Sequence, residues 1–344
     1  GITQVAINPA AGDDIVTFNS MVNLPSININ DGAGSDQVWV HGILSFANGS
    51  SLQVNSDSIS IGAVRSINTS GAGTISLSAD NISIGAGATL TSSANVELAP
   101  ISADRPIILG AESAIGLSLT GSELDLIITP SLVIGSATAG VVDVQANIAA
   151  ANASSLLLRT GRNIISFLGS TLVHPFLKLE AGTGIGTPSE PLLTQVPKIS
   201  AATATGRISI RNTGNLQVGD AATNGILVNG GNAGIALESS GSIRVERQIK
   251  SPGAISLTAA GAASDITVLA GVDAIKTTGT TPLISGISLS AGRDILLGAA
   301  VNPGDINSAG PTVLQAGNDV VVDATTYVMS IGNLQATAGG DFLI

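Results

Sequence analysis

The sequence has no cysteine, and charged, aromatic and histidine side chains are scarce in it. The absence of Cys from its 344 residues excludes disulfide bridges, thiolate chemistry and cysteine-ligated metals. Only two histidines, His41 and His174, are available as a general base for a catalytic triad. Aromatic residues make up 2% of the chain, so a core must be built from Ile, Leu, Val and Ala.

Charge is sparse and one-sided. Charged residues make up 11% of the chain, against about a quarter in ordinary globular domains, and the net charge is −11. No Lys or Arg precedes Arg65, whereas five aspartates do: Asp13, Asp14, Asp31, Asp36 and Asp57. An acidic surface argues against nucleic acids and anionic membranes as partners.

No apolar run is long enough to span a membrane, which takes about 18 residues. The best stretch, from Leu124 to Gly135, is interrupted by Asp125 and Pro130. We therefore expect no membrane insertion. The chain begins without Met or a signal-like segment and ends in the middle of a recurring phrase, so we interpret it as a piece of a longer protein.

What the sequence does contain is a repeat. Apolar–polar–apolar triplets recur throughout and are bounded by Gly, Asn, Asp or Ser, which indicates very short strands with one buried face. Matching triplets lie 20 to 25 residues apart: Ile59 to Ile82, Ile235 to Ile255, Ile266 to Ile287, Ile295 to Val320 and Val320 to Phe342. The stretches GDDIVTF from Gly12 and GSDQVWV from Gly34 repeat likewise. That alignment points Val16, Phe18, Val38 and Val40 inward and Thr17 and Trp39 outward.

This spacing predicts an all-β fold, a parallel β-solenoid of roughly fifteen coils with 20–25 residues each. We expect residues 1–344 to form one solenoid segment, with acidic coils over 1–55 and regular repeats over 56–344. Irregular coils are predicted near 119–135 and 187–200. In the first, Ser122 would cap a short helical turn with Glu123 and Asp125 in its first turn, ended by Pro130. The second is proline-rich and predicts a seam or an extruded loop.

The repeats resemble those of filamentous haemagglutinin-type bacterial exoproteins, which include two-partner-secretion adhesins. The similarity rests on AGRDILLGAAVN from Ala291, AGNDVVVDATT from Ala316, TGRNIISF from Thr160 and the block Leu119–Ile148, and it extends from about Ser56 onward. The family implies a right-handed parallel β-helix, secretion to the cell surface, and adhesion or matrix scaffolding. The secretion domain of the family carries an Asn-Pro-Asn-Gly type motif, to which INPAAGDD from Ile7 has only a faint similarity. We therefore expect this chain to belong to the repetitive shaft rather than to the secretion domain.

Few residues are candidates for chemistry. We predict a structural role for His174, which lies among apolar residues in LVHPF. Trp39 and His41 share a strand face and form either a small stacking platform or a pair covered by a neighbouring loop. The carboxylates of Asp13, Asp14 and Asp36 could serve a glycosidase or lyase, but no Lys or Arg lies near them in sequence. We predict no enzyme activity and no catalytic or cofactor-binding residue.

Calcium is the one cofactor that a motif suggests. Gly-x-Asp-x-hydrophobic occurs at Gly12–Val16 and again at Gly34–Val38, but 22 residues apart rather than the nine of a calcium roll. Turn formation is the simpler interpretation, and Asp14 and Asp36 are the ligands to test. The one basic cluster, Arg244, Arg247 and Lys250, is interrupted by Glu246 and predicts a solvated strand face.

These patterns favour a structural and adhesive shaft in a large extracellular or cell-surface bacterial protein. Its partners would be further coils or copies end to end, and surface glycans or proteins of host or neighbouring cells. The apolar end DFLI favours a second hypothesis, a subunit that stacks into an extracellular fibre. A β-helical polysaccharide-active enzyme is the third.

Overall fold

The computed structural model describes residues 2–167, 169–220, 224–281, 285–299 and 303–344. The chain is all-β, with about 1% helix, and its parallel sheets stack as a right-handed parallel β-helix of about 14 turns, close to the fifteen expected. It divides into two compact units. Unit 1 comprises Gly1–Arg162 and Phe167–His174, and unit 2 comprises Asn163–Ser166 and Pro175–Ile344.

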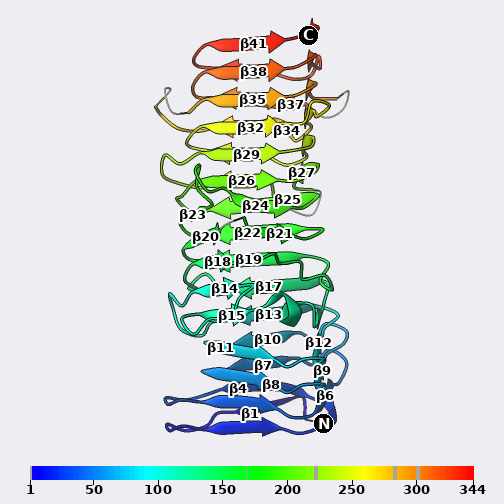
Figure 1. Ribbon diagram of the computed structural model, residues 1–344, viewed down its shortest axis with the longest axis vertical. Coiled ribbons are helices and arrows are strands. Elements are labelled where there is room, and N and C mark those ends of the chain that lie inside the picture. The colour runs from blue at the N-terminus through cyan, green and yellow to red at the C-terminus, as the bar shows by residue number, and fades with distance from the viewer. Residues whose placement is uncertain (1, 168, 221–223, 282–284, 300–302) are drawn as a thin grey trace. The chain divides into compact units, whose positions relative to one another are not determined.

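Each of the first coils of unit 1 passes through three strands on three faces (Figure 1). The first face holds β1 (Gln4–Ile7), β4 (Ser26–Asn30), β7 (Leu52–Asn55), β10 (Ile75–Ser78), β13 (Asn95–Ala99), β17 (Ser131–Gly135) and β19 (Leu156–Thr160). The second holds β2 (Ile15–Phe18), β5 (Gln37–Val40), β8 (Ser58–Ile61) and β11 (Asn81–Ile84). The third holds β3 (Met21–Leu24), β6 (Ile43–Phe46), β9 (Ser66–Asn68), β12 (Thr89–Thr91) and β16 (Ile127–Ile128). Unit 1 also contains β14 (Ile107–Leu109), β15 (Leu117–Leu119), β18 (Val142–Val144) and β21 (Thr171–Val173).

Unit 2 continues the pattern with a long face and two shorter strand columns. The long face holds β20 (Asn163–Ser166), β23 (Gly184–Ile185), β24 (Leu192–Gln195), β26 (Ile208–Asn212), β29 (Ile235–Ser239), β32 (Ile255–Ala259), β35 (Ile287–Ala291), β38 (Thr312–Ala316) and β41 (Leu334–Ala338). After β22 (Leu177–Ala181) and β25 (Lys198–Thr203), one column runs through β27 (Leu216–Val218), β30 (Ile243–Val245), β33 (Ile266–Val268), β36 (Ile295–Leu297), β39 (Val320–Val322) and β42 (Phe342–Leu343). The other runs through β28 (Ile226–Val228), β31 (Ile249–Ser251), β34 (Gly271–Thr277), β37 (Gly304–Ser308) and β40 (Val328–Ser330).

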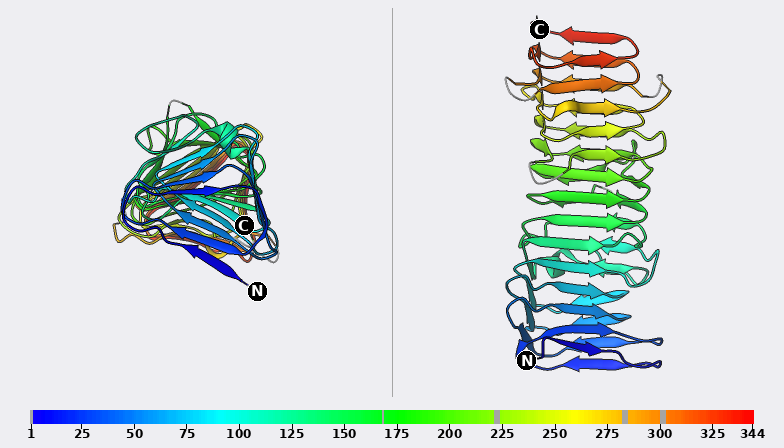
Figure 2. Two further views of the ribbon diagram at one scale, coloured as in Figure 1. Left: turned by 90° about the horizontal axis from the view of Figure 1, so that it is seen from below. Right: turned by 180° about the vertical axis from the view of Figure 1, so that it is seen from behind.

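The core of each unit is a set of aliphatic columns. Because side chains alternate along a strand, every second residue points inward and lies over its equivalent in the next coil. In unit 1, Ile27 lies over Leu52 and Leu52 over Ile75, and all three are at most 5% exposed. Within each unit, strands of successive coils lie directly over one another (Figure 2). Burying each such side chain contributes about 1.5–3 kcal/mol.

Most of the predicted pairings are confirmed. Ile59 pairs with Ile82, and in unit 2 Ile235 pairs with Ile255. Val320 pairs with both Ile295 and Phe342. In the N-terminal coils Val16 pairs with Val38 and Phe18 with Val40, and Thr17 and Trp39 point outward as expected, with Val16 half-buried.

The predicted match of Ile266 with Ile287 is wrong. Ile266 pairs with Ile295 on one face, whereas Ile287 pairs with Ile255 on another. Each coil carries similar triplets on several faces, so a spacing of about one coil also arises between strands that never meet. The triplets therefore establish strands and their buried sides, but not always the neighbour of a strand.

The predicted irregular coil near 119–135 is confirmed, with a different cause and cap. Val96 pairs with Leu132, 36 positions later, whereas the preceding register step, Ile75 to Val96, is 21. The extra residues form β15, which pairs with β14 on the side opposite to β18 and lies beside β11. In Figure 1, β11, β15, β14 and β18 follow one another along the stack, so the spatial order of β14 and β15 is inverted relative to the chain.

The short helix α1 (Gly121–Leu124) follows β15, but Ser122 is not its cap. Thr120 occupies the N-cap, accepting a hydrogen bond from the Glu123 backbone N–H, and Glu123 binds the Thr120 N–H in return. Asp125 is the C-cap rather than a first-turn residue, and the helix ends before Pro130. This reciprocal capping box satisfies two amide groups at once, which a cap at Ser122 would not do.

The second irregular segment, 187–200, is only partly extruded. β24 and β25 both begin within it, and β24 pairs with β26 through Leu192 and Ile210. Ile185 of β23 pairs with Ile208 on the same strand β26. The loop between β23 and β24 therefore interrupts one strand line and returns to it. The extruded part of the predicted irregular coil therefore ends before Leu192, and Leu192 and Ile199 fill core positions.

Candidate functional site

The glycines of the recurring phrase Ala-Gly-x-Asp in unit 2, Gly292, Gly317 and Gly339, form a column with Gly261, which we call the glycine corner. A Cβ atom on Gly292 would lie 2.1 Å from the carbonyl oxygen of Gly261, and one on Gly317 would lie 2.1 Å from that of Gly292. A Cβ atom on Gly339 would lie 2.2 Å from the carbonyl oxygen of Gly317. Only glycine therefore lets successive coils approach at this corner, which explains why the phrase recurs.

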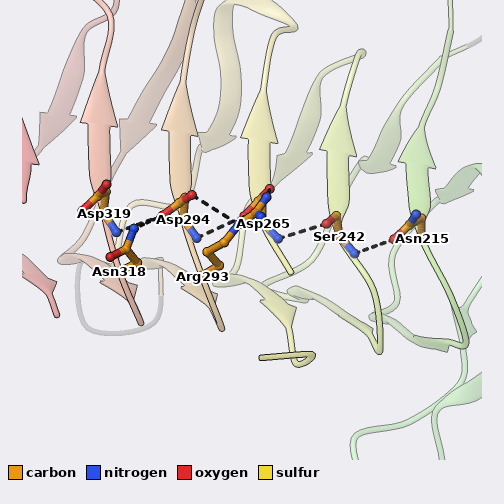
Figure 3. A network of polar contacts seen from close by, with 7 residues as sticks. All are labelled: Asn215, Ser242, Asp265, Arg293, Asp294, Asn318 and Asp319. Atoms are coloured by element: carbon orange, nitrogen blue, oxygen red, sulfur yellow. Dashed lines mark hydrogen bonds and ion pairs between the residues drawn. The ribbon is translucent and has the colours of Figure 1, made fainter. Parts of the chain in front are cut away.

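Beside the glycine corner runs a polar seam, a chain of side chains that accept backbone N–H groups from the next coil (Figure 3). The seam consists of Asn215, Ser242, Asp265, Asp294 and Asp319. The donor–acceptor distances of its successive hydrogen bonds are 2.9 Å for Ser242 N to Asn215 Oδ1, 3.0 Å for Asp265 N to Ser242 Oγ, 3.2 Å for Asp294 N to Asp265 Oδ1, 3.0 Å for Asp319 N to Asp294 Oδ1 and 2.8 Å for Asp341 N to Asp319 Oδ1.

Arg293 compensates the negative charge of the seam. Its guanidinium binds both carboxylate oxygens of Asp265, with Nε 2.7 Å from Oδ1, and lies 3.3 Å from Asp294 Oδ2. The hydrogen bond from Arg293 lowers the pKa of the Asp265 carboxyl against the opposing effect of burial. Asp294 is thus a turn residue that holds the next coil, as its place in the repeat predicts.

The acidic coils of unit 1 contain a similar staircase running in the opposite direction. The Asp14 backbone N–H donates to Asp36 Oδ1 and the Asp36 N–H donates to Asp57 Oδ2, both at 2.9 Å. Asp13 Oδ1 accepts the N–H of Ser35 at 2.9 Å. Asp36 is 2% exposed, so these carboxylates brace turns.

No group of three or more His, Cys, Asp or Glu side chains arranged to hold a metal ion occurs among the described residues. Calcium binding by Asp14 and Asp36 therefore stays a prediction. Burial raises the pKa of the nearby Asp31 carboxyl, and Asp36, Asp57 and Asp14 add to the rise.

The two histidines differ as predicted. His174 is 2% exposed and belongs to the packed interior. His41 is exposed, and its ring centroid lies 5.3 Å from that of Trp39 with the planes at 54°. Trp39 is 38% exposed, so no loop among the described residues covers this pair, and its use as a stacking platform stays a prediction. The indole N–H donates to Gln37 Oε1 at 2.9 Å, which fixes the ring.

The basic cluster is a partly paired strand face. Arg244 binds Glu246, and the Arg247 guanidinium donates to the backbone oxygen of Asp220. Lys250 is exposed on β31. This arrangement agrees with the predicted solvated face.

Sequence reasoning missed a groove in unit 1. Its volume is about 520 Å³, and its polar lining includes Asn81, Arg105, Glu112 and Ser118. Ser118 donates to Glu112 Oε2 at 3.1 Å, and Arg105 donates through two nitrogens to the Asp80 backbone oxygen. The groove arises where β15 inserts beside β11. The signal in the sequence is the lengthened repeat between Val96 and Leu132.

None of the helices in the described part of the chain is long and apolar enough to cross a membrane. Comparison with known protein families, with curated proteins and with solved structures found no match to this chain. The resemblance to filamentous haemagglutinin-type exoproteins therefore stays a prediction drawn from the repeats.

Proposed function

We propose that this chain is a structural and adhesive shaft of a large secreted or cell-surface bacterial protein, acting in adhesion or in an extracellular matrix. The observation that carries the proposal is that three kinds of interaction together hold each coil to the next. Backbone ladders, aliphatic columns and the polar seam each join one coil to the next, as at Ile255 to Ile287, Ile266 to Ile295 and Asp265 to Asp294. A stack bound in this way resists bending and local opening.

The composition supports an exposed setting. Cysteine is absent, so oxidation outside the cell cannot cross-link the chain wrongly. The seam also keeps turns ordered without disulfides or metals, because each turn amide binds a side chain of the neighbouring coil. The absence of enzyme activity stays a prediction beside this proposal.

Antibodies raised against residues 1–344 test the location. Intact source cells, compared with permeabilised cells and with an antibody to a cytosolic protein, should label on their surface or in their matrix. Label that appears only after permeabilisation would contradict the proposal. Cells lacking the gene should also adhere less to surfaces, and unchanged adhesion would remove the adhesive part.

Stacking into a fibre is the alternative, and electron microscopy of the purified protein addresses it. The last described strands leave apolar side chains exposed, with Phe342 at 46% and Leu343 at 50%. Discrete particles at every concentration would defeat self-assembly by this chain.

A further inference from the structure

The second face of unit 1 carries a line of outward polar and aromatic side chains, which we call the serine track. It starts at Trp39 on β5 with His41 just after that strand, crosses serines on β8 and β11, and ends in the groove beside β15. Its members are Trp39, His41, Ser58, Ser60, Asn81, Ser83, Arg105, Glu112 and Ser118.

The register places these residues in one line. Trp39 pairs with Ser60, and Ser60 pairs with Ser83, so the three side chains point outward one coil apart. Gln37, Ser58 and Asn81 form a parallel line on the same face. Because neighbouring strands lie about 4.8 Å apart, three coil steps separate Trp39 from the groove by about 14 Å.

The floor of the track is low and available for hydrogen bonding. Ser83 and Asn81 are exposed and Ser60 is half-buried. Among the described residues, none of these three side chains forms a hydrogen bond to the protein. Hydroxyl and amide groups both donate and accept, which suits the alternating donors and acceptors of a polyhydroxylated chain.

The aromatic end supplies a stacking surface. Gln37 already accepts the indole N–H, and Trp39 is 38% exposed, so the indole offers apolar ring surface to a ligand. His41 stands against it at 54°, and the two rings form an open corner. A ring with apolar C–H groups on one face and hydroxyls at its edge fits this corner, because the aromatic face is apolar and the adjoining floor is polar.

The charges next to the track disfavour polyanions as occupants. Asp36 and Asp57 lie just before β5 and β8, and the first Lys or Arg of the chain is the exposed Arg65, which follows β8. In the groove, Arg105 donates to Asp80 and lies 3.8 Å from its carboxylate, so it offers little free positive charge. A negatively charged glycan would be repelled along most of the track.

A peptide is disfavoured by the backbone. β5 and β8 are each paired on both sides, and on the edge strand β11 the Ile84 N–H already donates to Glu123 Oε1, which leaves little open edge onto which a peptide strand could add. We propose that the serine track binds an extended neutral oligosaccharide, with one sugar ring stacked on Trp39 and the chain running toward the groove. The proposal does not depend on the shaft function, because a track can bind sugars wherever the protein is located.

Trp39 is the sole tryptophan of the chain, so its fluorescence reports on this site alone. We expect saturable changes in its emission on titration with β-1,4-linked glucose or N-acetylglucosamine oligomers, from the disaccharide to the hexasaccharide. Affinity should rise with chain length until the track is filled and then level off. Heparin and alginate oligomers should give no saturable change.

Calorimetry on variants of the full chain tests each end. Trp39→Ala should weaken binding about tenfold, whereas Trp39→Phe should keep most of the affinity. Ser83→Arg should abolish the gain in affinity with chain length, whereas its matched control Ser76→Arg, outward on β10, should leave binding unchanged. Circular dichroism confirms that each variant is folded.

Three results would overturn the proposal. One is the absence of saturable binding by every neutral oligosaccharide tested. Another is unchanged affinity in folded Trp39→Ala, and the third is tighter binding of the polyanions or of unstructured peptides. None of these results bears on whether the protein lies at the cell surface, which the antibody experiment measures separately.

Discussion

Replacing Gly317 by Ala tests the glycine corner, the feature that most directly links the repeated phrase to the packing of unit 2. A Cβ atom there would lie 2.1 Å from the Gly292 carbonyl oxygen, and an ordinary contact needs at least 3.4 Å. The two coils would therefore have to separate by about 1.3 Å at this point. The obstacle is backbone, so no side chain can rotate to relieve it.

The loss of stability comes from the backbone hydrogen bonds that this separation of the coils would stretch. The Gly317 N–H to Ala291 O bond of 3.0 Å and the Asn318 N–H to Arg293 O bond of 2.8 Å both span the corner. Overpacking costs about 1–3 kcal/mol and each weakened hydrogen bond about 1 kcal/mol. The reduced entropy of the unfolded chain returns about 0.4–1 kcal/mol. Unfolding free energy should therefore fall by about 2–4 kcal/mol.

Calorimetry and hydrogen exchange measure this loss. The melting temperature of the transition that includes unit 2 should fall by about 5–15 °C, and amides of β38 and β41 should lose protection first. Gly121→Ala is the matched control, because a Cβ on Gly121 meets nothing nearer than 3.8 Å. A Gly317→Ala protein that melts within about 1 °C of the original would refute the steric account.

Two further changes probe the carboxylates. Asp294→Ala removes the acceptor for the Asp319 backbone N–H and should lower the unfolding free energy by about 1–2 kcal/mol; the loss is smaller than for a fully buried charged hydrogen bond because the Asp294 side chain is 21% exposed. Asp294→Asn keeps an acceptor oxygen and should cost less. Equal losses for the two variants in thermal melts would mean that the charge of Asp294, rather than its acceptor oxygen, stabilises the turn. Asp31→Asn should stabilise the protein at pH 7, because burial raises the pKa of the Asp31 carboxyl and its ionised form is disfavoured in the folded state. This advantage should shrink as the pH falls through the raised pKa and vanish below the ordinary value of about 4, so a benefit independent of pH in denaturant titrations would contradict the assignment.

Much of the candidate site could be anticipated from local pattern. The outward direction of Trp39 and the buried position of His174 follow from the alternation of apolar residues and their immediate neighbours. The groove could not be anticipated in this way, because its lining comes from residues as distant as Asn81 and Ser118. The serine track could not be anticipated either, because Ser60 and Ser83 line up with Trp39 only through the pairing of strands from successive coils.

The all-β class, the coil length and the inward side of most strands could be predicted from the sequence alone. These depend on interactions within a few residues and on one period, which composition and spacing record directly. Only the tertiary structure decided that Ile266 meets Ile295, that β15 inserts between β11 and β14, and that Thr120 rather than Ser122 caps α1. Triplets on different faces have similar sequences, so local sequence does not distinguish their partners. The pairing that forms is the one that closes the core and provides hydrogen bonds for the turn amides of the whole unit.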